Sequence, residues 1–194
     1  MKVDVKVPIG KSGDWSVEEF TISDSDAELF NLRSAISGAG VCGNRSVVPG
    51  TYKKLLHFNS TVMSNTPAEI ADSAYFVRKA TGSVLVSGLG LGAVLTTLLA
   101  KPEVTSITVL ERSEDVIKLV APTFKNEDRI TIIHTNALEW KPEKGVKFDC
   151  AWHDIWNTIC SDNLEDMKRL HRKYSRRCKW QLSWCRRECE RQAR

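Results

Sequence analysis

The sequence predicts an α/β fold built on a doubly wound, mostly parallel sheet, and two observations support this prediction. The first is the stretch Ser83–Ala93 (SVLVSGLGLGA), where an uncharged strand leads through three alternating glycines into an apolar helix. The second is a regular alternation of strand-like and helix-like segments after this turn. Because glycine permits a tight turn and leaves space beside the backbone, we expect a nucleotide-like ligand at this turn.

Length and composition agree with one domain plus an extension. The 194 residues can bury a sizeable core, and no stretch approaches the roughly 20 apolar residues that a bilayer span needs. The first six residues lack the apolar region of a secretion signal, and the six cysteines are scattered, so we expect a cytoplasmic protein with reduced thiols. Cys178, Cys185 and Cys189 are irregularly spaced, so no metal site is expected.

The charge is distributed unevenly along the chain. Residues 168–194 contain eleven Lys or Arg and two Glu, a local charge of +9, so with a net charge of +4 the rest of the chain carries about −5. A basic segment on an acidic body can attract nucleic acid, and it can also be an ordinary solvated surface.

The sequence pattern of residues 1–65 predicts an N-terminal extension with strands and a hairpin. Trp15–Ile22 alternates like a half-exposed strand, and Tyr52–Phe58 also resembles a strand. Between them, Ser25 or Asp26 can cap a helix over Ala27–Ile36. Residues 38–43 (GAGVCG) match G-x-G-x-x-G, but no strand precedes them and no helix follows, so we expect a flexible loop.

The pattern of residues 66–177 predicts a cofactor-binding core. We expect the basic residues 178–194 to complete or flank the sheet of this core. The core opens with a helix to about Ala80, in which Thr66 as N-cap, Pro67 and Glu69 suggest a capping box. After the glycine turn and a helix to Ala100, the expected strands are Ser106–Leu110, Arg129–His134, Lys147–Trp152 and Cys178–Trp184. The expected helices run from Ser113 through Val120 and from Ser161 or Asp162 through Tyr174, with a short helix at the end.

The residues that end the strands form a set: Gly88, Gly90 and Gly92 after the first strand of the core, Glu111 after the second, Asn136 after the third and Asp154 after the fourth. Ligands of such sheets bind beyond the carboxyl ends of the strands. An acid after the second strand can accept hydrogen bonds from both hydroxyls of a ribose, and an Asn after the third can pair with an adenine edge.

Over about Leu55 to Leu170, the sequence resembles the Rossmann-like class I S-adenosylmethionine-dependent methyltransferases, most closely their spermidine synthase-like branch. Residues 84–92 (VLVSGLGLG) resemble the first motif of the family, residues 109–111 (VLE) its ribose-binding acid, and residues 136–137 (NA) its adenine-contacting position. Residues 148–154 (FDCAWHD) resemble the strand that ends in the catalytic Asp of aminopropyltransferases. Leu55–Glu69 stands where those enzymes place a hairpin and gating helix.

This resemblance implies a small methyltransferase that uses S-adenosylmethionine and a small-molecule or polyamine-like acceptor. The implied cofactor-binding residues are Gly88, Gly90, Gly92, Glu111, Asn136, Ala137 and Asp154. Methyl transfer mainly needs positioning, and a base helps only if the acceptor arrives protonated. Asp154 is the first catalytic candidate and His153 the second, although strand alternation points His153 away from Asp154. Asp154 and Glu111 are also ordinary helix-capping residues at such positions.

The sequence departs from the family pattern in three places. Val86 stands where ordinary methyltransferases carry an acid, and in this it matches aminopropyltransferases. Leu91 stands where aminopropyltransferases carry an Asp, which favours methyl transfer. About five strands are predicted, whereas the full methyltransferase sheet has seven, so we expect a sheet truncated at its C-terminal edge.

Several alternatives remain open. One is a polyamine aminopropyltransferase, and another is a dinucleotide oxidoreductase, because Gly88, Gly90 and Ala93 satisfy G-x-G-x-x-A with Glu111 at the expected distance. A third is a non-catalytic protein that binds nucleic acid through its basic tail. An exposed N-terminal hairpin or sheet edge could pair two chains as a homodimer. Four tryptophans can wall an acceptor pocket or pack in the core: Trp152, Trp156, Trp180 and Trp184.

Overall fold

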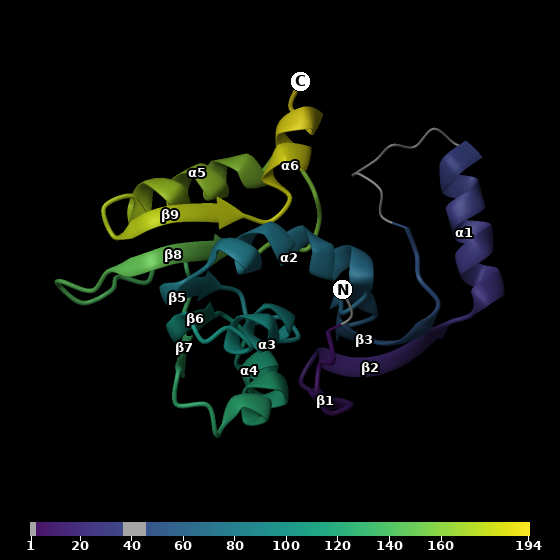
Figure 1. Ribbon diagram of the computed structural model, residues 1–194, viewed down its shortest axis with the longest axis horizontal. Helices are drawn as coiled ribbons and strands as arrows, with labels where there is room; N and C mark the ends of the chain where they lie inside the picture. Colours follow the sequence, from purple (N-terminus) through teal and green to yellow (C-terminus); the bar gives the residue numbers. More distant parts are fainter. Residues whose placement is uncertain (1–2, 37–45) are drawn as a thin grey trace.

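The computed structural model describes residues 3–36 and 46–194, which form two sheets (Figure 1). The first sheet is antiparallel and N-terminal, and the second is parallel and contains five strands. The flexible loop expected at residues 38–43 lies outside the described residues. Among the described residues, no helix has the length and apolar character needed to span a bilayer.

The N-terminal sheet contains four strands in sequence order, each antiparallel to its neighbour: β1 (Gly10–Ser12), β2 (Trp15–Ile22), β3 (Gly50–His57) and β4 (Ser60–Ser64). Helix α1 (Asp24–Ile36) stands between β2 and β3. The predicted N-caps of this helix, Ser25 and Asp26, are wrong, because Ser23 Oγ accepts a hydrogen bond from the Asp26 backbone N–H at 3.1 Å. The helix therefore begins directly after β2.

The parallel sheet has the strand order β7-β6-β5-β8-β9. Its strands are β5 (Gly82–Ser87), β6 (Val104–Glu111), β7 (Ile130–His134), β8 (Phe148–His153) and β9 (Cys178–Ser183). The accompanying helices are α2 (Pro67–Lys79), α3 (Ala93–Leu99), α4 (Glu114–Val120), the 3-10 turn η1 (Ala121–Phe124), α5 (Asn163–Tyr174) and α6 (Arg186–Gln192). These elements confirm the predicted α/β fold with a parallel sheet.

Helices cover both faces of this sheet, as a doubly wound fold requires. Val84 and Val86 of β5 belong to a core shared with α2, α3, α4 and the N-terminal segment. Leu85, on the opposite face, packs in a second core with Leu170 and Tyr174 of α5. Because the chain changes faces between β5 and β8, the loops that follow these two strands diverge and leave a crevice at the carboxyl edge.

The predicted capping box of α2 is wrong in its details. Thr66 is the N-cap residue, but its side chain makes no capping hydrogen bond. Glu69 instead accepts hydrogen bonds from the Ser64 backbone N–H at 2.7 Å and the Ser64 hydroxyl at 2.8 Å. Glu69 thereby ties the start of α2 to the end of β4, which fixes the hairpin relative to the parallel sheet.

Candidate functional site

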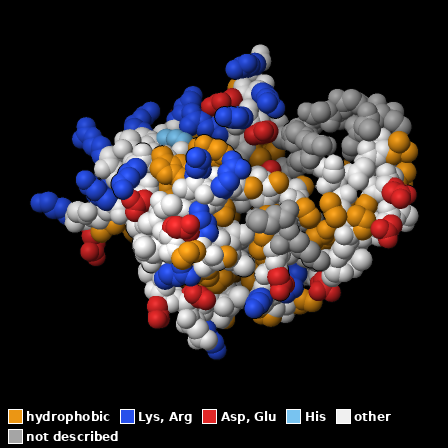
Figure 2. Space-filling model, viewed as in Figure 1, with side chains coloured by type: hydrophobic (Ala, Val, Ile, Leu, Met, Phe, Trp, Pro, Cys, Tyr) orange, Lys and Arg blue, Asp and Glu red, His pale blue; other side chains and the backbone are white. Residues whose placement is uncertain are grey.

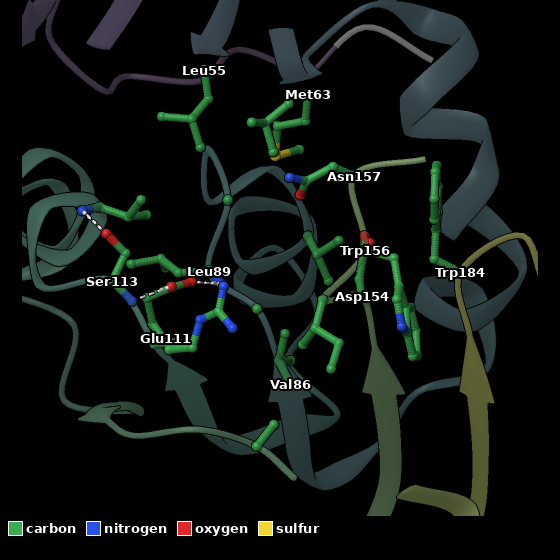
Figure 3. Close-up of a pocket in the computed structure, with 18 of the residues that line it drawn as sticks. Leu55, Met63, Val86, Leu89, Glu111, Ser113, Asp154, Trp156, Asn157 and Trp184 are labelled. Carbon is green, nitrogen blue, oxygen red and sulfur yellow. Dashed lines mark hydrogen bonds between the residues drawn. The ribbon is translucent and has the colours of Figure 1, made fainter. Parts of the chain in front are cut away.

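A cavity of about 410 Å³ lies at the carboxyl ends of β5, β6, β7 and β8 (Figure 3). The β3–β4 hairpin and the start of α2 close it from the side of the N-terminal sheet, through residues such as Leu55, Met63 and Glu69. This volume lies within the range of about 300–1,000 Å³ that small-molecule and cofactor sites occupy. The cavity stands where the topology of the sheet predicts a ligand.

The glycine turn borders the cavity at Gly88 and Gly90, whereas Gly92 lies outside its lining. All three have positive φ angles, of 97°, 51° and 71°. A Cβ atom on Gly88 would lie 2.0 Å from the Asp154 carbonyl oxygen, and one on Gly92 would lie 2.6 Å from the Phe124 ring. At Gly88 and Gly92, neighbouring protein atoms therefore occupy the space that a side chain would take.

Met63 of β4 lies against the same turn. A Cβ atom on Gly90 would lie 2.2 Å from Met63 Sδ, and the Leu91 backbone N–H donates a hydrogen bond to this sulfur at 3.1 Å. The Leu91 side chain itself is fully buried in the core. The side chain that lies against Gly90 is thus an unbranched thioether, which can change rotamer at small cost.

Glu111 ends β6 at the wall of the cavity. Its Oε2 accepts a hydrogen bond from the Leu89 backbone N–H at 2.8 Å, and its Oε1 accepts one from the Ser113 backbone N–H at 2.7 Å (Figure 3). Ser113 in turn caps α4, as predicted, through a bond from the Val116 N–H. Each carboxylate oxygen has a further lone pair, so Glu111 can also accept hydrogen bonds from the hydroxyls of a ligand.

Asn136 and Ala137 line the cavity after β7. The Asn136 side chain is partly engaged, since its Oδ1 accepts a hydrogen bond from the Leu138 N–H at 3.0 Å and its Nδ2 donates to Glu139 at 3.2 Å. An amide has two acceptor and two donor positions, so one of each is left for a base edge. Ala137 is buried beside it and adds an apolar contact.

Asp154 lies at the carboxyl end of β8 and borders the cavity (Figure 3). Burial raises the pKa of this carboxyl to about 7, and the negative charges of Asp72 and Glu69 raise it further. The nearby Trp152 indole N–H lowers it, although the pair does not reach full hydrogen-bond geometry. A carboxyl group with this pKa can give and take a proton near neutral pH.

His153 points to the opposite face of the sheet and does not border the cavity. Its side chain is fully buried, with Nδ1 at 2.9 Å from Ser87 Oγ and Nε2 at 3.1 Å from Gln181 Oε1. Because Gln181 Oε1 only accepts, Nε2 carries the proton and Nδ1 accepts from the serine hydroxyl. Burial lowers the His153 pKa to about 4, so the ring is neutral and serves the packing between β8 and α5.

Two acidic residues of α2 that the sequence analysis did not assign to the site lie near Asp154. Glu69 lines the cavity, and Asp72 accepts a hydrogen bond from the Trp184 indole N–H at 3.1 Å. Asp166 of α5 also lines the cavity. The spacing of Glu69 and Asp72 places both on one face of the helix, and this signal could have identified them.

Three of the four highlighted tryptophans line the cavity: Trp152, Trp156 and Trp184. Trp180 packs against Phe76 of α2 with ring centroids 5.3 Å apart, so it belongs to the core. The indole N–H groups of Trp152 and Trp156 are buried and have no hydrogen-bond partner within the described part of the chain.

These features fit S-adenosylmethionine, because the cavity has the size of a cofactor site and the Glu111 carboxylate lies beside the glycine turn. The described residues contain no cluster of three or more side chains that could hold a metal ion.

No protein-family model and no curated protein sequence matches this chain. Solved structures with a similar arrangement include a Staphylococcus aureus protein provisionally described as a caffeoyl-CoA O-methyltransferase, with 19% identity and a TM-score of 0.44 over 57% of this chain and 52% of that one. A Clostridium acetobutylicum S-adenosylmethionine-dependent methyltransferase has 14% sequence identity and a TM-score of 0.42, over 57% of this chain and 44% of that one. The Bradyrhizobium japonicum N-methyltransferase NodS has 14% sequence identity and a TM-score of 0.42, over 56% of this chain and 63% of that one. The chain spans less than two thirds of each, so its fold assignment rests on its own sheet topology.

Proposed function

We propose that this protein is an S-adenosylmethionine-dependent methyltransferase that acts on a cationic amine. The observation that carries the proposal is the position of Asp154, whose pKa of about 7 belongs to a carboxyl group inside the cavity that also contains the glycine turn and Glu111. A group at this place in the fold, with this pKa, suits a general base at neutral pH.

The residues at the ends of β5, β6 and β7 would hold the cofactor. Glu111 would accept hydrogen bonds from the ribose hydroxyls, and Asn136 would pair with the adenine edge beside Ala137. S-adenosylmethionine supplies a methyl group that its positively charged sulfur already activates. The protein therefore has to orient the acceptor and exclude water, for which the β3–β4 hairpin and the tryptophan walls are placed.

The charge of the cavity supports a cationic acceptor. Its lining contains one arginine, Arg112, against the acids Glu69, Glu111, Asp154 and Asp166. Asp72 also lies near enough to Asp154 to raise the pKa of that carboxyl. Indole faces also attract cations, by about 0.5–2 kcal/mol each depending on exposure. An ammonium ion would therefore be drawn to this side of the cavity.

A protonated amine must lose a proton before its nitrogen can attack. In the proposed mechanism the Asp154 carboxylate would accept this proton and so free the nitrogen lone pair for attack, while bound S-adenosylmethionine would supply the methyl group and leave as S-adenosylhomocysteine. Leu91 supports methyl over aminopropyl transfer, because it places a buried apolar side chain where aminopropyltransferases carry a carboxylate.

A matrix of donors and acceptors tests the proposal. Purified protein is incubated with S-adenosylmethionine or its decarboxylated form, each with diamines, polyamines, monoamines and phenols, and products are identified by mass. We expect a mass gain of one methyl group on an amine. Methylation confined to phenols would overturn the amine assignment, and transfer from the decarboxylated donor alone would establish an aminopropyltransferase.

A further inference from the structure

A second, more open cavity of about 610 Å³ lies at the other edge of the parallel sheet. It is formed by the loop before β8 and the turn between α5 and β9. Five of its eight lining residues are basic: Lys147, Arg172, Lys173, Arg176 and Arg177. We call these five residues and the hollow between them the basic groove. Lys and Arg side chains also gather over α5 and β9 in Figure 2.

The charges of the basic groove are not neutralised by the described part of the chain, where none of its five cations forms an ion pair. Arg177 donates to the carbonyl oxygens of Glu143 and Val146 at 3.1 and 3.0 Å, and Lys173 donates to that of Ala137 at 3.1 Å. These bonds to neutral carbonyls hold the side chains of Arg177 and Lys173 without cancelling their charge.

Like charges also crowd one another at this site. Burial lowers the pKa of Lys173, and the neighbouring cations Arg169 and Lys141 lower it further, whereas the Glu139 carboxylate raises it. The C-terminal end of α5 favours the basic residues of its last turn, Arg172 and Lys173. It does not account for Lys147, which comes from a different loop, or for Arg176 beyond the helix. An external anion would relieve this repulsion.

The cations of the basic groove suit the phosphates of a nucleic acid strand. Arg172 and Lys173 lie in the last turn of α5, Arg176 and Arg177 follow in the turn after this helix, and Lys147 comes from the loop before β8. A nucleic acid strand presents a series of negative charges that several cations of a protein can neutralise together. We propose that the basic groove binds the phosphate backbone of a nucleic acid.

The groove and the active-site cavity lie at opposite ends of β8. The strand has six residues, which corresponds to about 20 Å. The groove is therefore a docking site separate from the chemistry, and its occupation does not depend on the proposed methyl transfer.

Fluorescence anisotropy with a labelled 20-nucleotide DNA, single- and double-stranded, measures the binding over a range of salt concentrations. The test variant is Arg172→Gln with Arg176→Gln, and the matched control is Arg187→Gln with Arg191→Gln on α6, since all four side chains are exposed. Each phosphate contact contributes about −0.7 (single strand) to −0.9 (duplex) to the slope of log K against log salt. We expect the test variant to bind at least tenfold more weakly with a slope about 1.4–1.8 less negative, and the control to stay within threefold.

Three results would overturn the proposal. One is no binding of either DNA by the wild-type protein at 50 mM salt. The second is an equal loss of affinity in the control variant, which would move the interaction to the C-terminal helix. The third is binding of tripolyphosphate as tight as that of the DNA, which would make the groove a site for a small polyphosphate.

Discussion

Strand β8 carries an aspartate near each end, and the two carboxyl groups have opposite properties. Asp149, near the amino end, pairs with Lys179 at 2.5 Å and accepts a hydrogen bond from the Ser83 N–H at 2.8 Å, and these contacts lower its pKa. Asp154, directly after the strand, is half-buried, and burial together with the negative charges of Asp72 and Glu69 raises its pKa to about 7. An aspartate thus forms structural contacts at the amino end of β8, whereas another aspartate is a candidate base at the carboxyl end.

The largest effect is expected when Asp154 and Asp149 are each changed to Asn. Removing a general base typically costs 10²- to 10⁴-fold in rate, so Asp154→Asn should lose at least a hundredfold in kcat with an amine acceptor. Asp149→Asn should stay within threefold of the wild-type kcat. Steady-state kinetics on both variants test this difference, and a similar loss in both would mean that Asp154 has no special chemical role.

The pH dependence of the wild-type rate gives a second test. Because the base must be deprotonated, kcat should rise with pH through about 7 and level off above it. In Asp154→Asn the residual rate should lack this step. A wild-type profile that is flat between pH 6 and 8 would contradict the assignment.

Stability should respond to pH in opposite directions at the two aspartates. The raised pKa means that Asp154 binds its proton more tightly in the folded protein than in the unfolded chain. Protonated Asp154 therefore contributes to the free energy of unfolding, and this contribution declines as pH rises from about 4 to about 7. Asp154→Asn should therefore unfold at higher free energy than wild type at pH 8, by about 1–3 kcal/mol, and at equal free energy near pH 4. Asp149 has a lowered pKa, so its ionised form stabilises the folded protein above the ordinary pKa of an aspartate, and this stabilisation is lost as the pH falls into the acid range. Urea unfolding at several pH values measures both, and equal pH dependence of the two variants would refute the contrast.

A smaller effect is expected from Met63, which covers the glycine turn. Met63→Ala removes the sulfur that accepts the Leu91 N–H and opens space beside Gly90, so S-adenosylhomocysteine should bind about three- to tenfold more tightly. Met63→Leu keeps the bulk and should bind about as the wild type does. Calorimetry on both variants checks this, and weaker binding by Met63→Ala would show that the side chain supports the ligand.

The smallest effect on ligand binding is expected from His153, the immediate neighbour of Asp154. His153→Phe leaves Ser87 and Gln181 without their shared partner inside the core, so it should lower the free energy of unfolding by about 1–3 kcal/mol. Its affinity for S-adenosylhomocysteine should stay within twofold. A loss of affinity without a loss of stability would assign His153 to the site.

The elements of the parallel sheet could be predicted from local patterns. The apolar run of β5, the cap at Ser113 and the helical spacing of Met167, Leu170 and Tyr174 are each visible within a dozen residues. The meeting of Glu111, Asn136 and Asp154 at one cavity followed from the rule that parallel strands end at the same edge. No contact between distant segments had to be known.

The parts of the cavity and of the basic groove that could not be predicted depend on packing between segments far apart in the sequence. Met63 and Glu69 reach the cavity because the N-terminal hairpin folds back over the sheet. The basic groove joins Lys147 to the end of α5, whereas the charge count treated residues 168–194 as one basic tail and could not show which of its cations lie together. In that tail Lys179 and Arg186 are paired with acids, which a count of charges cannot show.

The central claim is that the cavity binds S-adenosylmethionine through Glu111, and calorimetry tests it most directly. Wild-type protein, Glu111→Gln and the matched variant Glu114→Gln on α4 are titrated with S-adenosylmethionine and with NAD, after thermal unfolding has shown that all three are folded. We predict micromolar binding of S-adenosylmethionine by the wild type and Glu114→Gln, and about 10- to 100-fold weaker binding by Glu111→Gln, since hydrogen bonds to a charged group contribute about 1.5–3 kcal/mol. Preference for NAD, or equal affinity in Glu111→Gln and wild type, would contradict the account.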